Sequence, residues 1–191
     1  MRKISISSSA VIIVVVALAT LTLESGSAAA APRSDFESIK IRNFGEVNNH
    51  IYRGARPEGH DYSDLAALGI RTVVDLESGD PSDERQQVEA AGMKFVQIPM
   101  SDSAMPDRDS VSKFLALANG AADQPIFVHC RGGRHRTGAV IAVYRMTHDG
   151  WTAASAYEEM KNFRFNVGFT HSHQPLKKYV LDYSEVEAPR S

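Results

Sequence analysis

The sequence predicts an α/β fold: a single-domain three-layer sandwich in which a mostly parallel sheet of about four to five strands is flanked by helices. Short apolar runs rich in β-branched residues alternate with helical patterns, as in parallel sheets connected by helices. The runs at residues 73–74 and 126–128 are continuously apolar, which is typical of strands buried on both faces. The chain has 191 residues, enough for one domain with a substantial core but hardly enough for two.

The first 31 residues have the layout of a secretory signal peptide. Arg2 and Lys3 give a positive start, residues 11–23 form an apolar run, and small residues continue to Ala31. The run is shorter than the roughly 20 residues that a membrane-spanning helix needs. We therefore expect a cleaved signal peptide over residues 1–31 and a periplasmic or secreted protein. The alternative is an uncleaved N-terminal anchor, and only then would the protein be tied to a membrane.

The chain has a single cysteine, Cys130, although export would place it where disulfides form. No internal disulfide is possible, so the fold must depend on its hydrophobic core. The net charge of −2 gives no reason to expect binding to nucleic acid or to an acidic membrane surface. Residues 32–46 are polar and form a lead-in, and residues 47–188 form the folded domain.

Four segments after the lead-in have the composition of strands. The second contains Thr72, Val73 and Val74 in succession, and prolines bound the third and fourth. The strand candidates are residues 50–53, 70–76, 94–98 and 126–129.

Helical patterns lie between and after these strands. Gly69 and Gly92 follow the first two, as expected at helix C-termini, and the third places apolar side chains on one face. The helix candidates are residues 62–68, 81–91, 109–118, 138–148, 152–163 and 176–186.

A glycine-containing loop, residues 129–138, joins the fourth strand candidate to the helix after it and reads His-Cys-Arg-Gly-Gly-Arg-His-Arg-Thr-Gly. In open α/β sheets, ligands bind beyond the carboxyl ends of the strands, and a helix N-terminus presents unpaired N–H groups to anions. Gly132 and Gly133 allow the backbone to curl so that successive N–H groups face inward. The loop is therefore predicted to bind a phosphate-like anion.

Cys130 and Arg136 lie six residues apart at the two ends of this loop. A cysteine surrounded by N–H dipoles should have a lowered pKa and act as a thiolate nucleophile. The planar guanidinium of Arg136 matches two oxygens of a phosphate. Thr137 can donate its hydroxyl to the sulfur, and His129 can support the loop by a hydrogen bond to the backbone.

The pattern His-Cys, five residues, Arg-Thr-Gly resembles the signature of the cysteine-based protein tyrosine and dual-specificity phosphatases. Residues 51–57 (IYRGARP) and 74–76 (VDL) are similar to segments of the bacterial, plant and fungal dual-specificity-like branch. The resemblance implies a phosphoric monoester hydrolase that works through a cysteinyl-phosphate intermediate, with no cofactor and no metal. We expect Arg53 and Arg56 to be structural. Residues 47–188 would then be a phosphatase-like domain, with these substrate-binding residues: Arg131, Gly132, Gly133, Arg134, His135 and Thr137.

Other anion-binding loops fit the spacing less well. Rhodanese-type sulfurtransferases have a shorter loop with an arginine five residues after the cysteine, where this chain has His135. The nucleotide-binding P-loop needs Gly-Lys-Ser/Thr, which the sequence lacks. An inactive phosphate-binding module is the alternative from another class, although a nucleophile, an arginine and an acid all have candidates.

Cleavage of a phosphate ester also needs a general acid for the leaving oxygen. Asp102 is our candidate, because residues 98–102 (IPMSD) resemble the apolar-Pro-x-x-Asp pattern of the dual-specificity branch. This segment follows the third strand, so we expect it to lie beside the fourth. Asp107, directly after Pro106, is the competitor, since the tyrosine-specific branch places its acid after a proline. We expect Asp109 to cap the helix that follows.

Three basic residues inside the loop, Arg131, Arg134 and His135, resemble the extra charge of members that act on phosphoinositides or inositol phosphates. The alternative is that they point to solvent. We expect a phosphotyrosine or other phosphoprotein substrate, with lipid head groups, inositol phosphates or other small phosphate esters as alternatives, and no nucleic acid. His171 and His173 have no accompanying ligand cluster, so we expect a surface or capping role.

Overall fold

The computed structural model describes residues 39–166 and 172–183. The predicted signal peptide, residues 32–38 of the predicted lead-in and His171 lie outside these residues. Within them the chain forms strands and helices in alternation, and the elements are β1 (Gly45–Asn48), β2 (Ile51–Ala55), α1 (Asp61–Ala67), β3 (Thr72–Asp75), α2 (Ser82–Ala90), β4 (Lys94–Gln97), α3 (Arg108–Asn119), β5 (Ile126–Cys130), α4 (Arg136–Thr147), α5 (Ala153–Asn162) and α6 (Gln174–Leu181).

The described strands form one sheet in the order β1-β2-β5-β3-β4. Only β1 is antiparallel to its neighbour; β2, β5, β3 and β4 run parallel. Ala55 pairs with Cys130, and Asp75 pairs with His129, so β2, β5 and β3 end side by side. The predicted fold class is therefore confirmed, and Cys130 ends the central strand of this sheet.

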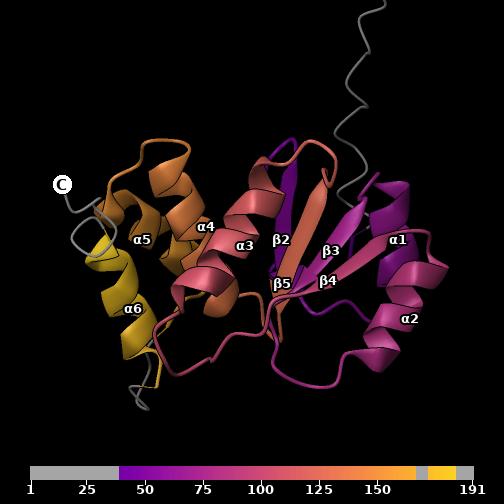
Figure 1. Cartoon of the computed structure of the whole chain (residues 1–191), viewed down its shortest axis with the longest axis horizontal. Helices are drawn as coiled ribbons and strands as arrows, with labels where there is room; N and C mark the ends of the chain where they lie inside the picture. Colours follow the sequence, from indigo (N-terminus) through magenta and orange to yellow (C-terminus); the bar gives the residue numbers. More distant parts are fainter. Residues whose placement is uncertain (1–38, 167–171, 184–191) are drawn as a thin grey trace, which may run out of the picture. The chain divides into compact units, whose positions relative to one another are not determined.

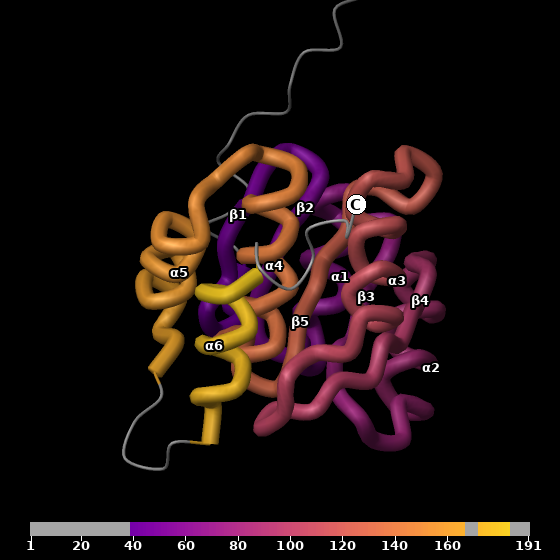
Figure 2. The backbone as a smooth tube through the Cα atoms, turned by 60° about the vertical axis from the view of Figure 1, so that its left-hand side comes forward, coloured from indigo at the N-terminus to yellow at the C-terminus, as the bar shows by residue number. Residues whose placement is uncertain are grey.

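Helices cover both faces of the sheet (Figure 1). On one face, α1 and α2 bury Leu65 and Val88 against Val73 and Phe127. On the other, α3 and α4 pack on the apolar side chains of β3 and β5, with Phe114 fully buried. Helices α5 and α6 pack on the outer side of α4 through a third apolar cluster that includes Met160 (Figure 2). The apolar character of α4 on most sides follows from this position between two layers.

Two details differ from the sequence-based expectations. The segment after β4 was expected beside β5, but β3 separates those two strands in the sheet. The segment still reaches the end of β5 because it crosses the carboxyl edge of the sheet, where Met100 N–H donates to the carbonyl of Leu76. The edge strand β1 was not predicted, since its sequence, GEVN, has too little apolar character to indicate a strand.

No helix within the described residues has both the length and the apolar composition needed to cross a membrane.

Candidate active site

The phosphate loop, residues 130–136, starts at the last residue of β5 and ends at the first residue of α4. Gly133 has a φ of +64°, and a Cβ at this position would lie 2.3 Å from the carbonyl carbon and oxygen of Gly54. Gly132 has more space, since a Cβ there would meet only the side chain of Arg134, at 3.7 Å. Only Gly133 is therefore required by both backbone conformation and space.

Two side-chain donors, one half-buried and one fully buried, hold the loop through a single carbonyl group. Asn43 Nδ2 donates to the Gly133 carbonyl oxygen at 2.8 Å, and Arg53 Nη2 donates to the same oxygen at 3.0 Å. The Arg53 side chain is fully buried, with its guanidinium 3.8 Å from the ring centre of Phe163. Burial lowers the pKa of Arg53 to about 10, so this guanidinium stays charged at neutral pH. Arg53, predicted to be structural, lies directly under the site.

The thiol of Cys130 is almost fully buried, with 3% exposure. Burial alone would raise its pKa, but the neighbouring hydroxyl and N–H group of Thr137 lower it. The charge of Arg136 and a hydrogen bond from the N–H of Gly132 lower it further, and the net pKa lies below the ordinary thiol value. The loop and the start of α4 thus favour the thiolate form.

Arg136 lies beside the cysteine and is held by groups that follow β3 and β4. Its Nη1 donates to the carbonyl oxygens of Leu76 at 3.2 Å and Met100 at 3.4 Å. Its Nη2 lies 3.9 Å from Oε2 of Glu77. The Nε of Arg136 is buried and has no hydrogen-bond partner among the described residues. A phosphate oxygen would satisfy this donor.

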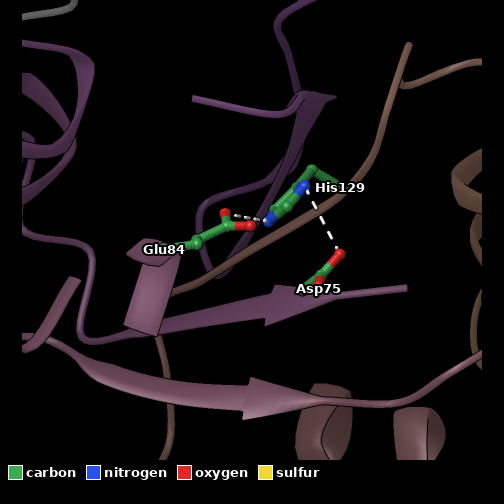
Figure 3. A group of neighbouring side chains, drawn as sticks. All are labelled: Asp75, Glu84 and His129. Atoms are coloured by element: carbon green, nitrogen blue, oxygen red, sulfur yellow. Dashed lines mark ion pairs between the residues drawn. The ribbon is translucent and has the colours of Figure 1, made fainter. Parts of the chain in front are cut away.

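His129 lies between two buried carboxylates (Figure 3). The sequence predicts a hydrogen bond from His129 to the backbone instead. Its Nε2 is 2.8 Å from Oε1 of Glu84, and its Nδ1 is 3.9 Å from Oδ1 of Asp75. One ligand atom from each of the three side chains lies within 4.8 Å of the other two, and the two carboxylates face different nitrogens of the ring. The arrangement suits a fixed imidazole that supports the end of β5.

Arg56 extends this buried network toward the phosphate loop. Its Nε lies 2.9 Å from Glu84 and 3.8 Å from Glu77, and Glu77 in turn faces Arg136. Burial alone would raise the pKa of Glu84, but hydrogen bonds and charges from His129 and Arg56 lower it, so the carboxylate is ionised. Arg56 therefore connects α2 to the segment after β3, and it lines the larger pocket.

The two candidate acids occupy different environments. Asp102 is exposed and lines both pockets beside the phosphate loop, of about 530 and 380 Å³. Asp107 is the N-cap of α3: it accepts hydrogen bonds from the N–H and the hydroxyl of Ser110 at 2.8 and 2.7 Å. These bonds lower the pKa of Asp107 and keep it ionised. Asp107, not the expected Asp109, is thus the cap of α3, while Asp102 faces the two pockets.

The model for the tyrosine phosphatase family matches residues 38–188. The chain belongs to the tyrosine phosphatase family. Among curated relatives, the dual specificity protein phosphatase TpbA of Pseudomonas aeruginosa is 30% identical over 139 residues, which cover 71% of this chain and 62% of TpbA. The inositol diphosphatase SIW14 of Saccharomyces cerevisiae is 29% identical over 152 residues, which cover 76% of this chain and 54% of SIW14. The chain thus spans between half and two thirds of the length of these relatives.

Solved structures of the same two proteins have the same fold. The core catalytic domain of the PP-IP phosphatase SIW14 gives a TM-score of 0.65 at 25% identity, over 77% of this chain and 90% of that one. P. aeruginosa TpbA gives 0.61 at 27% identity, over 73% of this chain and 83% of that one. The family therefore includes relatives named for protein substrates and others named for inositol diphosphates.

Three residues of the site were not singled out as functional by the sequence. Arg42 lies in the lead-in and lines the smaller pocket with Arg131, Arg134 and His135. Glu84 supports His129, and His173 lines the same pocket as Arg42. None of the three carries a signal in the sequence: Glu84 is one of many polar residues in α2, and Arg42 and His173 reach the site through tertiary contacts alone.

Proposed function

We propose that this chain is an exported phosphatase that hydrolyses phosphate monoesters, with phosphotyrosine or other phosphoprotein substrates. The observation that carries the proposal is the buried Cys130 thiol with a lowered pKa, inside a loop that ends at Arg136. The family relatives named as dual specificity protein phosphatases support the substrate class.

The chemistry follows from the positions of three side chains. The Cys130 thiolate attacks phosphorus and forms a P–S bond while the P–O bond to the leaving group breaks. Asp102 gives its proton to the leaving oxygen and then takes a proton from the water that attacks the cysteinyl phosphate. Release of inorganic phosphate returns Cys130 to the thiolate. Throughout, the N–H groups of the loop and the Arg136 guanidinium stabilise the charge on the phosphoryl oxygens.

Phosphate release by the domain should be measured with a phosphotyrosine peptide, a phosphothreonine peptide, an inositol polyphosphate and a phosphoinositide. We expect hydrolysis of the phosphotyrosine peptide, loss of more than about 10³-fold in Cys130→Ser, and no effect of a chelator. An unchanged rate in Cys130→Ser would contradict the mechanism. Phosphate binding without turnover of any substrate would instead favour an inactive phosphate-binding module.

A second candidate substrate class, phosphoinositides or inositol phosphates, is favoured by the arginines at the pocket mouth. Arg42, Arg131 and Arg134 line the pocket of about 380 Å³, and none of their guanidinium groups has a hydrogen bond or ion pair within the described part of the chain. Such groups suit a substrate with further phosphates.

This candidate predicts that Arg131→Ala or Arg134→Ala reduces turnover of an inositol polyphosphate more than that of p-nitrophenyl phosphate. Arg71→Ala is the matched control, since Arg71 is exposed at the opposite edge of the sheet, where β3 begins. Equal losses on both substrates would reject the second candidate.

The location outside the cytoplasm rests on residues 1–31 alone. N-terminal sequencing of the protein from a producing cell should find a chain that starts near Pro32. An N-terminus at residue 1 or 2 would favour the anchored alternative.

A further inference from the structure

His173, the residue before α6, joins three segments at the mouth of the site. Its Nδ1 lies 2.8 Å from the backbone carbonyl oxygen of Asp102, and its ring stacks on His135 with centroids 3.4 Å apart and planes 17° apart. Because a carbonyl oxygen can only accept, Nδ1 carries the proton and donates it. His173 thus connects α6 and the phosphate loop to the loop that carries Asp102.

The ring of His135, on which His173 stacks, is itself held in place by two contacts. Its Nε2 lies 3.2 Å from the carbonyl oxygen of Asn166, and the edge of its ring meets Phe165 at 5.2 Å between centroids. Burial, with help from the nearby charge of His173, lowers the pKa of His135 to about 4. The His135 ring is therefore neutral at pH 7.

The acid loop, residues 101–106, has few other attachments. Ser101 Oγ accepts from the N–H groups of Ser103 and Ala104 at 3.2 Å, but these bonds lie within the loop itself. Among the described residues, the bond from His173 is the one hydrogen bond that ties residues 101–106 to another element. Asp102 to Met105 are exposed, so packing contributes little to the position of this part of the loop.

We propose that His173 is a positioning residue that holds the acid loop over the phosphate loop, so that the Asp102 carboxyl stays within reach of the leaving oxygen. This inference rests on the proposed function, with Asp102 as general acid. Misplacement of a catalytic group by an ångström can reduce a rate strongly. The reduction should fall on substrates whose leaving group needs a proton, because a good leaving group departs without one.

Three variants separate the hydrogen bond from the stack. His173→Ala removes both, His173→Phe keeps an aromatic ring but has no donor, and His173→Asn keeps an N–H donor close to the position of Nδ1. We expect Ala and Phe to lower kcat on phenyl phosphate by roughly tenfold, with p-nitrophenyl phosphate within about twofold of the parent and Asn near the parent on both. His148→Ala is the control, since His148 stacks on Tyr144 at the far end of α4.

The decisive measurement is the same substitution in an Asp102→Asn background. If His173 acts through Asp102, His173→Phe should cause no further loss on phenyl phosphate in that background, whatever it does to stability. Equal, additive losses on both substrates, or full activity of His173→Phe on phenyl phosphate, would overturn the inference. If the parent hydrolyses neither substrate, the proposed function fails. If the parent is active and the His173 variants hydrolyse phenyl phosphate as fast as the parent, only the inference about His173 fails.

Discussion

The phosphate loop and the acid loop face each other across the same pocket, but different interactions hold them. Arg53 and Asn43 hold the phosphate loop from below, and Glu84 fixes the histidine next to its cysteine. The acid loop is exposed from residue 101 to Met105, and among the residues that the structure describes its one hydrogen bond to another element comes from His173. The nucleophile is thus preorganised in the folded core, whereas the proposed acid depends on one exposed contact.

The difference has a chemical rationale. A thiolate and a bound phosphoryl group need fixed dipoles that do not reorient during the reaction, which a buried network provides. The general acid must meet leaving groups of different size, and a lightly attached loop can adapt to them. Mutations in the two loops should therefore have different effects. Those in the phosphate loop should lower stability and the turnover of every substrate, and those in the acid loop should lower the turnover of substrates whose leaving group needs a proton.

Gly133→Ala should have the largest effect on the phosphate loop. The new Cβ would lie 2.3 Å from the backbone of Gly54, at a φ of +64°. We expect the free energy of unfolding to fall by about 3 kcal/mol or more, measured by urea denaturation. Gly132→Ala is the matched control and should cost below about 1 kcal/mol. Equal costs for the two variants would contradict the rigid fit described for this loop.

Alanine substitutions at the two aspartates should separate catalysis from stability. Asp102→Ala should lower kcat on phenyl phosphate by about 10²-fold without changing the free energy of unfolding. Asp107→Ala should remove the cap of α3 and cost about 1 kcal/mol of stability with kcat nearly unchanged. The opposite pattern, with kcat lost in Asp107→Ala and kept in Asp102→Ala, would assign the acid to Asp107.

The smallest expected effect is a shift in the pH midpoint of Cys130 alkylation by iodoacetamide, which reports the pKa of this thiol alone. Because the thiol pKa is lowered, the reaction should reach half its maximal rate at a pH below that of an ordinary thiol. Thr137→Val removes the hydroxyl that favours the thiolate, so the midpoint should move to higher pH. Ser103→Ala, on the acid loop, should leave it unchanged, and a shift there would show that the two loops are coupled at the sulfur.

The sequence predicted the fold class and the phosphate loop because both are encoded locally. Apolar β-branched runs indicate buried strands, and the spacing of Cys130 and Arg136 is read within one loop. The partners of His129 and the contacts of His173 could not be predicted, since Glu84 and Asp102 lie 45 and 71 residues away in the chain. The predicted cap of α3 was wrong by two residues, because Asp107 and Asp109 stand close together before the apolar residues of the helix, and only the backbone geometry shows that Asp109 already lies in its first turn.

Direct detection of phosphate on Cys130 would test the central claim. The protein should be mixed with p-nitrophenyl phosphate, quenched in acid within milliseconds and digested, and the peptide with Cys130 analysed by mass spectrometry. We expect one added phosphoryl group on Cys130 in the parent, a larger phosphorylated fraction in Asp102→Asn because the attack of water becomes slow, and no phosphorylated peptide in Cys130→Ser. Turnover with no phosphoryl group on Cys130, or a phosphoryl group on another residue in the parent, would contradict this claim.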